Sequence, residues 1–246
     1  MRGLFAGLAG LLCAVAANAA DIAVLPVGLS LDAGHDRAAI TVTNQGQESV
    51  VMHVETVSWQ QAEGQDQYAP TRDLLVNPPI FTLAPGRAQV LRIGLRQPPS
   101  GERETAYRLL LREVPPTGTA AAADSGADQG RVRVLLQLRL PVYVAPARIV
   151  RDQQWRGRRT ADGAVAVTAS NTGTVHLVAS ELKLRPGGAA SDAAPIAALQ
   201  TSATVFPGQS RTWTLPPQTA MTGQHFTLEV TTDQGTRHVA LDLGQP

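Results

Sequence analysis

Cysteine and lysine are almost missing from this chain, and aromatic residues make up only 4% of it. The single cysteine is Cys13, so residues 14–246 have no thiol for a disulfide or a cysteine-based metal site. Lys183 is the only lysine, a bias that genome composition explains and to which we attach no function. The formal net charge of +1 gives no strong field toward nucleic acid or a membrane surface.

Catalytic patterns are also lacking. The histidines are scattered, without metal-ligand spacing, at His35, His53, His176, His225 and His238. No nucleophile elbow, phosphate-binding loop or Cys–His pairing is visible. We therefore expect no catalytic site, no metal and no cofactor, and we predict that the chain is not an enzyme.

The first twenty residues have the pattern of a secretory signal peptide. Arg2 supplies positive charge, residues 4–16 are apolar, and Ala17, Asn18 and Ala19 place small residues around a cleavage point. We expect cleavage near Ala19 or Ala20. The apolar stretch is too short to span a bilayer comfortably, so we predict export without stable membrane insertion.

The chain as a whole has 22 glycines and 17 prolines, and after the first twenty residues it shows no useful helical periodicity, which is typical of many short strands joined by turns. Residues 39–46 and 165–173 each form a strand pattern that runs into an Asn-x-Gly turn, at Asn44 and Asn171. The Pro-Gly turns at 83–86 and 205–208 repeat in the same way. The sequence therefore predicts an all-β chain with two immunoglobulin-like sandwiches in tandem, residues 21–146 and 147–246, with the boundary at 146–151.

Residues 131–144 carry the clearest pattern in the chain. Val132, Val134, Leu136, Leu138 and Leu140 occupy every second position, which puts their side chains on one face of a strand. The preceding run, 117–130, contains little that can pack. Two interpretations are open: an ordinary internal strand, or a strand kept available for the open sheet of another protein.

Two motifs carry a resemblance to a known family. Residues 77–86 read Asn-Pro-Pro-Ile-Phe-Thr-Leu-Ala-Pro-Gly, and residues 107–116 read Tyr-Arg-Leu-Leu-Leu-Arg-Glu-Val-Pro-Pro. With the alternating strand that follows, they resemble the PapD-like periplasmic chaperones of the chaperone–usher pilus pathway. The resemblance covers residues 21–146. Beyond that range it depends on weaker features, chiefly Asn171, the Pro-Gly turn and residues 233–235.

The resemblance implies a boomerang of two immunoglobulin-like domains that works in the periplasm. Its partners would be pilus or fimbrial subunits, which it binds, folds and delivers to an outer-membrane usher. It would do so by donor-strand complementation, with Val132, Val134 and Leu136 as donor residues and Leu138 and Leu140 as extensions. A free molecule should hide this edge, either by a disordered loop and strand end or by self-association.

The chain departs from the family at the anchor for the carboxylate at the subunit's C-terminus. The two basic residues of classical members fall on Gly28 and Pro141, a departure that resembles the archaic branch of the family. Because an unpaired buried charge is costly, another arginine should take this role. The candidates are Arg92, Arg108, Arg112 and Arg139, with Arg92 as first choice.

A second family feature is an interdomain ion pair. Its acidic members fall on Glu104 and Asp233, and its arginine falls on Ala145, so Arg148 is the candidate substitute.

The alternative function is that of an exported structural or adhesive sandwich protein, such as a pilus subunit or a carbohydrate-binding module. A subunit should carry an alternating apolar N-terminal extension, which residues 22–31 resemble weakly, and should lack its last strand. A sugar-binding module usually exposes several aromatic residues, whereas the tryptophans and tyrosines here are few and scattered.

Overall fold

The computed structural model describes residues 21–115, 134–188, 193–219 and 221–243, and these residues form 17 strands and no helix. Within these ranges there is accordingly no helix of the length and apolarity needed to cross a membrane. The first ten strands are β1 (Ile22–Leu25), β2 (Leu29–Leu31), β3 (Arg37–Asn44), β4 (Val50–Ala62), β5 (Gln65–Pro70), β6 (Leu74–Asn77), β7 (Ile80–Leu83), β8 (Ala88–Leu95), β9 (Thr105–Val114) and β10 (Gln137–Val144). The remaining strands are β11 (Gln153–Arg159), β12 (Val165–Asn171), β13 (Leu177–Pro186), β14 (Ala197–Val205), β15 (Ser210–Leu215), β16 (His225–Thr232) and β17 (Gly235–Asp242).

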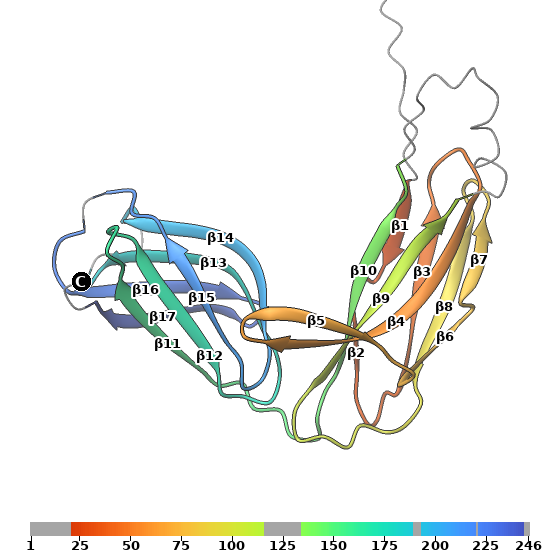
Figure 1. The fold of residues 1–246 in the computed structure, drawn as a ribbon, viewed down its shortest axis with the longest axis horizontal. Coiled ribbons are helices and arrows are strands. Elements are labelled where there is room, and N and C mark those ends of the chain that lie inside the picture. The colour runs from red at the N-terminus through yellow and green to blue at the C-terminus, as the bar shows by residue number, and fades with distance from the viewer. Residues whose placement is uncertain (1–20, 116–133, 189–192, 220, 244–246) are drawn as a thin grey trace, which may run out of the picture.

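The strands make two sandwiches that lie one after the other along the chain and at an angle to each other (Figure 1). In the N-terminal sandwich, a sheet in the order β1-β3-β8-β6 packs on a second sheet in the order β2-β10-β9-β4-β5, with β7 paired to β4. The C-terminal sandwich packs β11-β12-β15 on β14-β13-β16-β17. This arrangement confirms the predicted all-β fold of two tandem immunoglobulin-like domains.

Alternation of apolar and polar residues produces both cores. In β3, for example, Ile40 and Val42 are buried while their neighbours are exposed or partly buried, because successive side chains point to opposite faces of the sheet. Each sandwich has its own apolar cluster between its sheets. A third, smaller cluster contains Trp59 and Ala106 of the N-terminal domain and Phe206 of the C-terminal domain, so it joins the two.

The segment between β10 and β11 is tied to the C-terminal domain rather than free. Thr174 N donates a hydrogen bond to Val150 O at 2.8 Å, and Val150 N donates to Thr174 Oγ1 at 2.8 Å. Gly173 permits this contact, since a Cβ atom at that position would lie 2.3 Å from Val150 O. The connection is therefore held against the β12–β13 turn.

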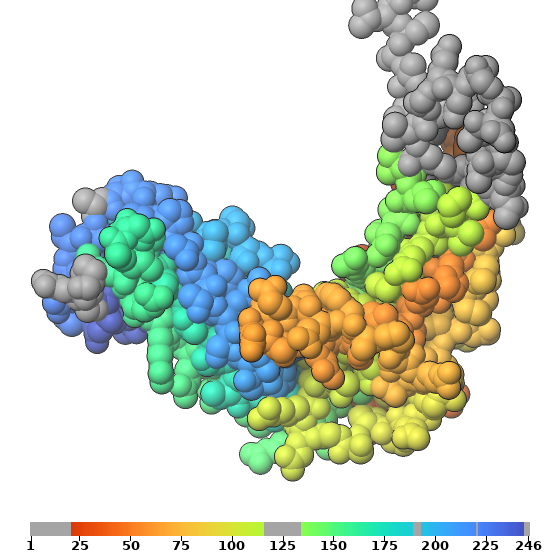
Figure 2. Space-filling model, in the orientation of Figure 1, coloured from red at the N-terminus to blue at the C-terminus, as the bar shows by residue number. Residues whose placement is uncertain are grey.

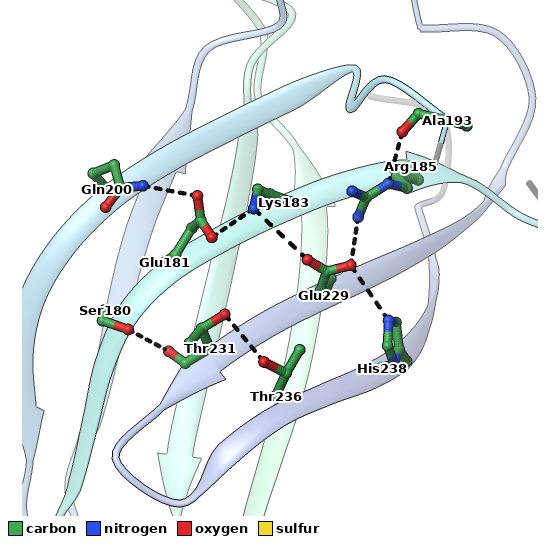
Figure 3. A network of polar contacts seen from close by, with 10 residues as sticks. All are labelled: Ser180, Glu181, Lys183, Arg185, Ala193, Gln200, Glu229, Thr231, Thr236 and His238. Carbon is green, nitrogen blue, oxygen red and sulfur yellow. Dashed lines mark hydrogen bonds and ion pairs between the residues drawn. The ribbon is translucent and has the colours of Figure 1, made fainter. Parts of the chain in front are cut away.

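A network of charged side chains covers one face of the sheet β14-β13-β16-β17 (Figure 3). Glu229 on β16 accepts a hydrogen bond from Arg185 Nη1 at 2.7 Å and lies 3.8 Å from Lys183 Nζ and 3.3 Å from His238 Nε2. Glu181 pairs with Lys183 at 2.6 Å. The charges are thus mutually compensated on this face.

Candidate functional site

Strand β10 belongs to the chain's own core at one end only. It is antiparallel to β9 along its whole length, from Gln137 opposite Arg112 to Val144 opposite Thr105. Its other edge meets β2 only at residues 142–144. Among the described strands, no partner covers that edge from 134 to 141.

Burial along the alternating face changes from one end to the other. Leu140 is 8% exposed and lies in the core of the N-terminal sandwich, and Leu138 packs against that core. Leu136 is partly buried and Val134 is 70% exposed. The side chain of Leu140 is therefore already packed inside its own domain, whereas Val134 and Leu136 are the described donor candidates that extend beyond the core. Val132 lies outside the described residues.

The exposed apolar segment is nevertheless held in strand register. Glu113 N donates a hydrogen bond to Leu136 O at 2.9 Å, and Leu136 N donates to Glu113 Oε2 at 3.2 Å. The hydrogen bonding to β9 thus begins at Leu136, one residue before β10 starts at Gln137. The apolar face therefore continues past the buried core toward solvent, and Leu136 at that point is already bonded to β9.

The four candidate anchor arginines lie in two different places. Arg92 is exposed on β8, in the sheet that does not contain β10. The cross-strand partners of β9 and β10 put Arg108, Arg112 and Arg139 together on the outer face of the other sheet, away from the core. That face borders the cleft between the two domains (Figure 2). The first choice, Arg92, is therefore on the wrong sheet to meet a partner bound along β10.

Among the three arginines on the cleft face, Arg108 has the most distinctive surroundings. Arg112 Nη1 already pairs with Glu55 Oε2 at 3.1 Å, and Arg139 is exposed on β10 itself. Arg108 is half-buried, with its Cζ atom 3.5 Å from the centroid of the Trp59 ring. Within the described part of the chain it has no carboxylate partner, and its Nε atom is buried without a hydrogen bond.

Two tyrosines lie near the same guanidinium. Burial and then the charge of Asp66 raise the pKa of the Tyr68 hydroxyl, while Arg108 opposes the rise. Burial also raises the pKa of Tyr143, against the opposing effects of Thr204 and Arg108. Arg108 thus lies over Trp59 and is close enough to both hydroxyls to act on their charge. A cation in this position favours a planar anion such as a carboxylate.

Gly28 and Pro141, where classical family members carry basic residues, lie against each other. A Cβ atom at Gly28 would be 3.0 Å from Pro141 Cγ, so a side chain at this position would press on the Pro141 ring. Pro141 is in turn directly opposite Arg108 on the neighbouring strand. The positive charge that these two positions lack is therefore present one strand away.

The predicted interdomain ion pair is wrong in its partners. Glu104 Oε1 lies 2.7 Å from His176 Nδ1 and also accepts the backbone N–H of His176 at 3.2 Å. Asp233 instead accepts a hydrogen bond from Val178 N within the C-terminal domain. No ion pair in the described ranges includes Arg148, whose carbonyl accepts a hydrogen bond from Thr174. The sequence did identify Glu104 as an interdomain residue but did not reveal its partner.

Residues that the sequence analysis missed are the aromatic and amide side chains of the domain interface. They are Trp59, Gln61, Tyr68, Tyr143 and Phe206. Tyr143 lies between the core residues Val142 and Val144, which is a signal that its side chain faces outward. Trp59 is an odd number of positions from Val54, the last core residue of its strand, and so faces the same way. Their contacts with the C-terminal domain cannot be predicted from the pattern of a single strand, because those contacts depend on how the two domains are arranged.

The histidines do not gather. His53 Nδ1 lies 3.6 Å from Glu55 Oε1 in the pair shared with Arg112, and His176 pairs with Glu104. The described ranges contain no group of three or more residues arranged to hold a metal ion.

The fold and the open edge define a two-domain immunoglobulin-like protein with an apolar strand end that its own sandwich does not cover. Residues 21–150 match the family model described as "Pili and flagellar-assembly chaperone, PapD N-terminal domain". The chain therefore belongs to the PapD family of pilus and flagellar-assembly chaperones. No curated protein sequence matches the chain.

Solved structures support the fold over nearly the whole chain. A chain in the complex of the chaperone CsuC with the tip adhesion subunit CsuE, from archaic Csu pili of Acinetobacter baumannii, matches with a TM-score of 0.61 and 16% identity, covering 92% of this chain and 100% of that one. The Salmonella enterica complex of SafA pilin with the SafB chaperone gives a TM-score of 0.60 at 18% identity, with 91% and 97% coverage. The Pseudomonas aeruginosa CupB2 chaperone gives 0.56 at 16% identity, with 90% and 100% coverage.

Proposed function

We propose that this chaperone captures pilus or fimbrial subunits by lending them the apolar segment that precedes β10, and passes them to an outer-membrane usher. The observation that carries the proposal is the apolar face that leaves the core at Leu138 and continues through Leu136 to Val134, which is 70% exposed. Complete burial of one valine or leucine favours binding by roughly 1.5–3 kcal/mol. Ordering and desolvation reduce the net gain.

Strand addition also explains how one chaperone serves several subunits. The uncovered edge from 134 to 141 offers main-chain hydrogen bonds, which demand little of the partner's sequence. Specificity then comes from the apolar side chains at every second position. In the absence of a subunit, the same edge would favour self-association through paired strands.

The carboxylate anchor is assigned to Arg108. Its guanidinium lies on the cleft face next to Pro141, is not neutralised by any carboxylate of the described chain, and is partly desolvated by the Trp59 ring. Arg139, three positions from the Val142 that β2 covers, would extend the positive charge toward the donor segment. This replacement of the classical anchor agrees with assignment to the archaic branch.

The remaining parts of the proposal concern where and how the protein acts. The export pattern of residues 1–20, which lie outside the described residues, supports a periplasmic location. The protein acts by binding alone, without catalysis, cofactor or metal, and without nucleic acid or stable membrane insertion.

The test is subunit capture by a variant with Val134→Arg and Leu136→Arg together. A tagged variant is co-produced with a pilus subunit that co-purifies with the wild-type chain, and the periplasmic extract is purified on the tag. We expect export and folding to persist, because neither residue belongs to the buried core, and recovery of the subunit to be abolished.

The matched control carries Leu75→Arg and Val90→Arg, two exposed apolar residues in the sheet without β10. It should recover the subunit as the wild type does. Undiminished recovery by the Val134/Leu136 variant would contradict strand donation by this segment.

A further inference from the structure

The two domains meet through an aromatic contact that lies directly under the proposed anchor. Trp59, only 3% exposed, packs edge-on against Phe206 of the C-terminal domain, with ring centroids 4.7 Å apart and an interplanar angle of 74°. Its ring also lies 6.0 Å from that of Tyr143. The face of the same Trp59 ring supports the Arg108 guanidinium at 3.5 Å. One side chain therefore contacts both the anchor and the other domain.

Gln61 holds Phe206 in place through two hydrogen bonds between its side-chain amide and the backbone of the C-terminal domain. The β4–β5 hairpin reaches across to the C-terminal domain (Figures 1 and 2), and there Gln61 Nε2 donates a hydrogen bond to Thr204 O at 2.9 Å. Phe206 N donates to Gln61 Oε1 at 3.0 Å. The side-chain amide thus offers a donor and an acceptor to the backbone of residues 204–206, as a neighbouring strand would. Asp66 Oδ1 accepts a further bond from Gln61 Nε2 at 2.9 Å and orients the amide.

His176 of the C-terminal domain supports the Tyr143 ring of the N-terminal domain. The two rings are stacked, with centroids 3.7 Å apart and an angle of 12°. His176 Nδ1 lies 2.7 Å from the carboxylate of Glu104, whose side chain is only 4% exposed. Glu104 N also donates to Thr174 O at 2.8 Å, next to His176. This histidine is thereby fixed by the N-terminal domain while its ring supports Tyr143.

These contacts form two continuous paths into the anchor. One runs from Gln61 through Phe206 to Trp59, and the other runs from Glu104 through His176 to Tyr143. Arg108 has no carboxylate partner in the described residues and its Nε atom makes no hydrogen bond, so its plane is fixed by the Trp59 ring and by a side-chain hydrogen bond with Tyr68. The direction of the guanidinium therefore depends on the Trp59 ring. The position of that ring in turn depends on its contact with Phe206 of the C-terminal domain.

We propose that Gln61 and His176 are positioning residues for the carboxylate anchor, so that Arg108 binds a subunit's terminal carboxylate fully only at this domain angle. The inference rests on the proposed function, because it takes Arg108 as the anchor. It implies a coupling between the domain interface and the binding of the subunit, which is reciprocal.

The test is a double-mutant cycle on subunit affinity, measured by competition with a pilus subunit that co-purifies with the wild-type chain. The variants are Arg108→Ala, Gln61→Met and the two combined. Methionine keeps the length and packing of Gln61 but makes neither of its interdomain hydrogen bonds. We expect Arg108→Ala to weaken binding about 30-fold or more, and Gln61→Met about 10-fold.

The decisive result is the effect of Arg108→Ala in the Gln61→Met background. If Gln61 acts through Arg108, that effect should be at least about 5-fold smaller than in the wild type. Equal effects in the two backgrounds would overturn the proposal, since Gln61 would then contribute independently of the anchor. Lys183→Ala, whose side chain pairs with Glu181 and Glu229 within the C-terminal domain, is the control that should combine additively with Arg108→Ala.

Two substitutions separate the two roles of His176. His176→Phe keeps a ring against Tyr143 but removes the donor to Glu104, and His176→Asn keeps a donor but removes the ring. Small-angle X-ray scattering reports whether the arrangement of the domains has changed. We expect every variant that changes the scattering profile to reduce the Arg108→Ala effect as well. A variant that alters the profile but leaves that effect intact would contradict positioning through the interface.

Failure of the inference differs from failure of the proposed function. If Arg108→Ala alone does not change affinity, the anchor assignment and this inference are both wrong. Strand donation would then still stand or fall on the Val134/Leu136 variant.

Discussion

Asn44 and Asn171 make the same hydrogen bonds in the two sandwiches. Asn44 Nδ2 donates to Glu48 O at 2.7 Å and to Leu83 O at 3.0 Å, while its Oδ1 accepts the N–H of Gly46. Asn171 repeats this pattern with the carbonyls of residues 175 and 205, at 2.8 and 2.9 Å, and with the N–H of residue 173. Both side chains are buried, so each amide satisfies the polar groups of two loops in a place that water does not reach.

We expect Asn44→Ala and Asn171→Ala each to lower the free energy of unfolding of their own domain by about 1–3 kcal/mol, because buried carbonyls lose their donors. Urea denaturation of each variant measures this. Thr168→Ala, which removes an exposed hydroxyl pair with Thr212, is the control and should change stability by well under 1 kcal/mol. Asparagine variants as stable as this control would show that the shared pattern is not stabilising.

For subunit binding, the placement of the arginines predicts a contrast between Arg108→Ala and Arg92→Ala. If Arg108 meets the carboxylate in a desolvated cleft, its removal should cost about 2–5 kcal/mol of binding free energy. Arg92 is exposed on the other sheet and should contribute less than about 1 kcal/mol. Competition binding of both variants against wild type distinguishes them, and a larger loss for Arg92 would reverse the assignment.

The charge network of Figure 3 should matter more to stability than the charge pair on the cleft face. Glu229 and Arg185 have side chains that are 16% and 11% exposed, against 39% and 45% for Glu55 and Arg112. Glu229→Gln weakens charged hydrogen bonds in a partly desolvated site, and we expect a loss of about 1.5–3 kcal/mol in the free energy of unfolding. Glu55→Gln should cost less than about 1 kcal/mol. Chemical denaturation of the two variants measures both losses in the free energy of unfolding. Equal losses for Glu229→Gln and Glu55→Gln would contradict this prediction.

The tyrosines give a prediction at alkaline pH. Burial and then the neighbouring charge of Asp73 raise the pKa of Tyr107 to about 12, and its hydroxyl donates a hydrogen bond to Asp73 Oδ2 at 3.2 Å. In the unfolded chain this hydroxyl ionises near its usual pKa of 10.0. Between these two values the folded state retains a proton that the unfolded state has lost, so stability should fall as pH rises from about 10 to 12.

Absorbance of the phenolate during a pH titration should therefore show Tyr107 ionising last, while the protein remains folded. In Tyr107→Phe the loss of stability over this pH range should be smaller. Ionisation of all the tyrosines together near pH 10 without unfolding would contradict the burial of this hydroxyl beside Asp73.

Much of the fold could be predicted from the sequence because it depends on local patterns. Alternation identified β10, and the Asn-x-Gly and Pro-Gly turns identified the repeat of two sandwiches. The end of the core along β10 could not be predicted, because Leu136, Leu138 and Leu140 are equivalent in the pattern. Their burial differs because the core of the N-terminal sandwich includes Leu140, is lined by Leu138 and ends before Leu136.

The site was predicted less well, for a related reason. Arg92 and Arg108 both lie on strands with similar patterns, and only the pairing of β9 with β10 puts Arg108 on the cleft face. His176 and Gln61 gave no signal, because their partners are in the other domain. Contacts between domains depend on the angle between them, which no single strand pattern encodes.

The engagement of Lys183 with Glu181 and Glu229 has a practical chemical consequence. It is the only side-chain amine in the chain, and it is half-buried and ion-paired, while residues 14–246 contain no cysteine. Reagents that attack amines or thiols therefore find almost no background target on the folded domains. One cysteine introduced at an exposed site in each domain would accept a pair of fluorescent dyes cleanly, and energy transfer between them would follow the domain angle in single molecules as a subunit arrives and leaves.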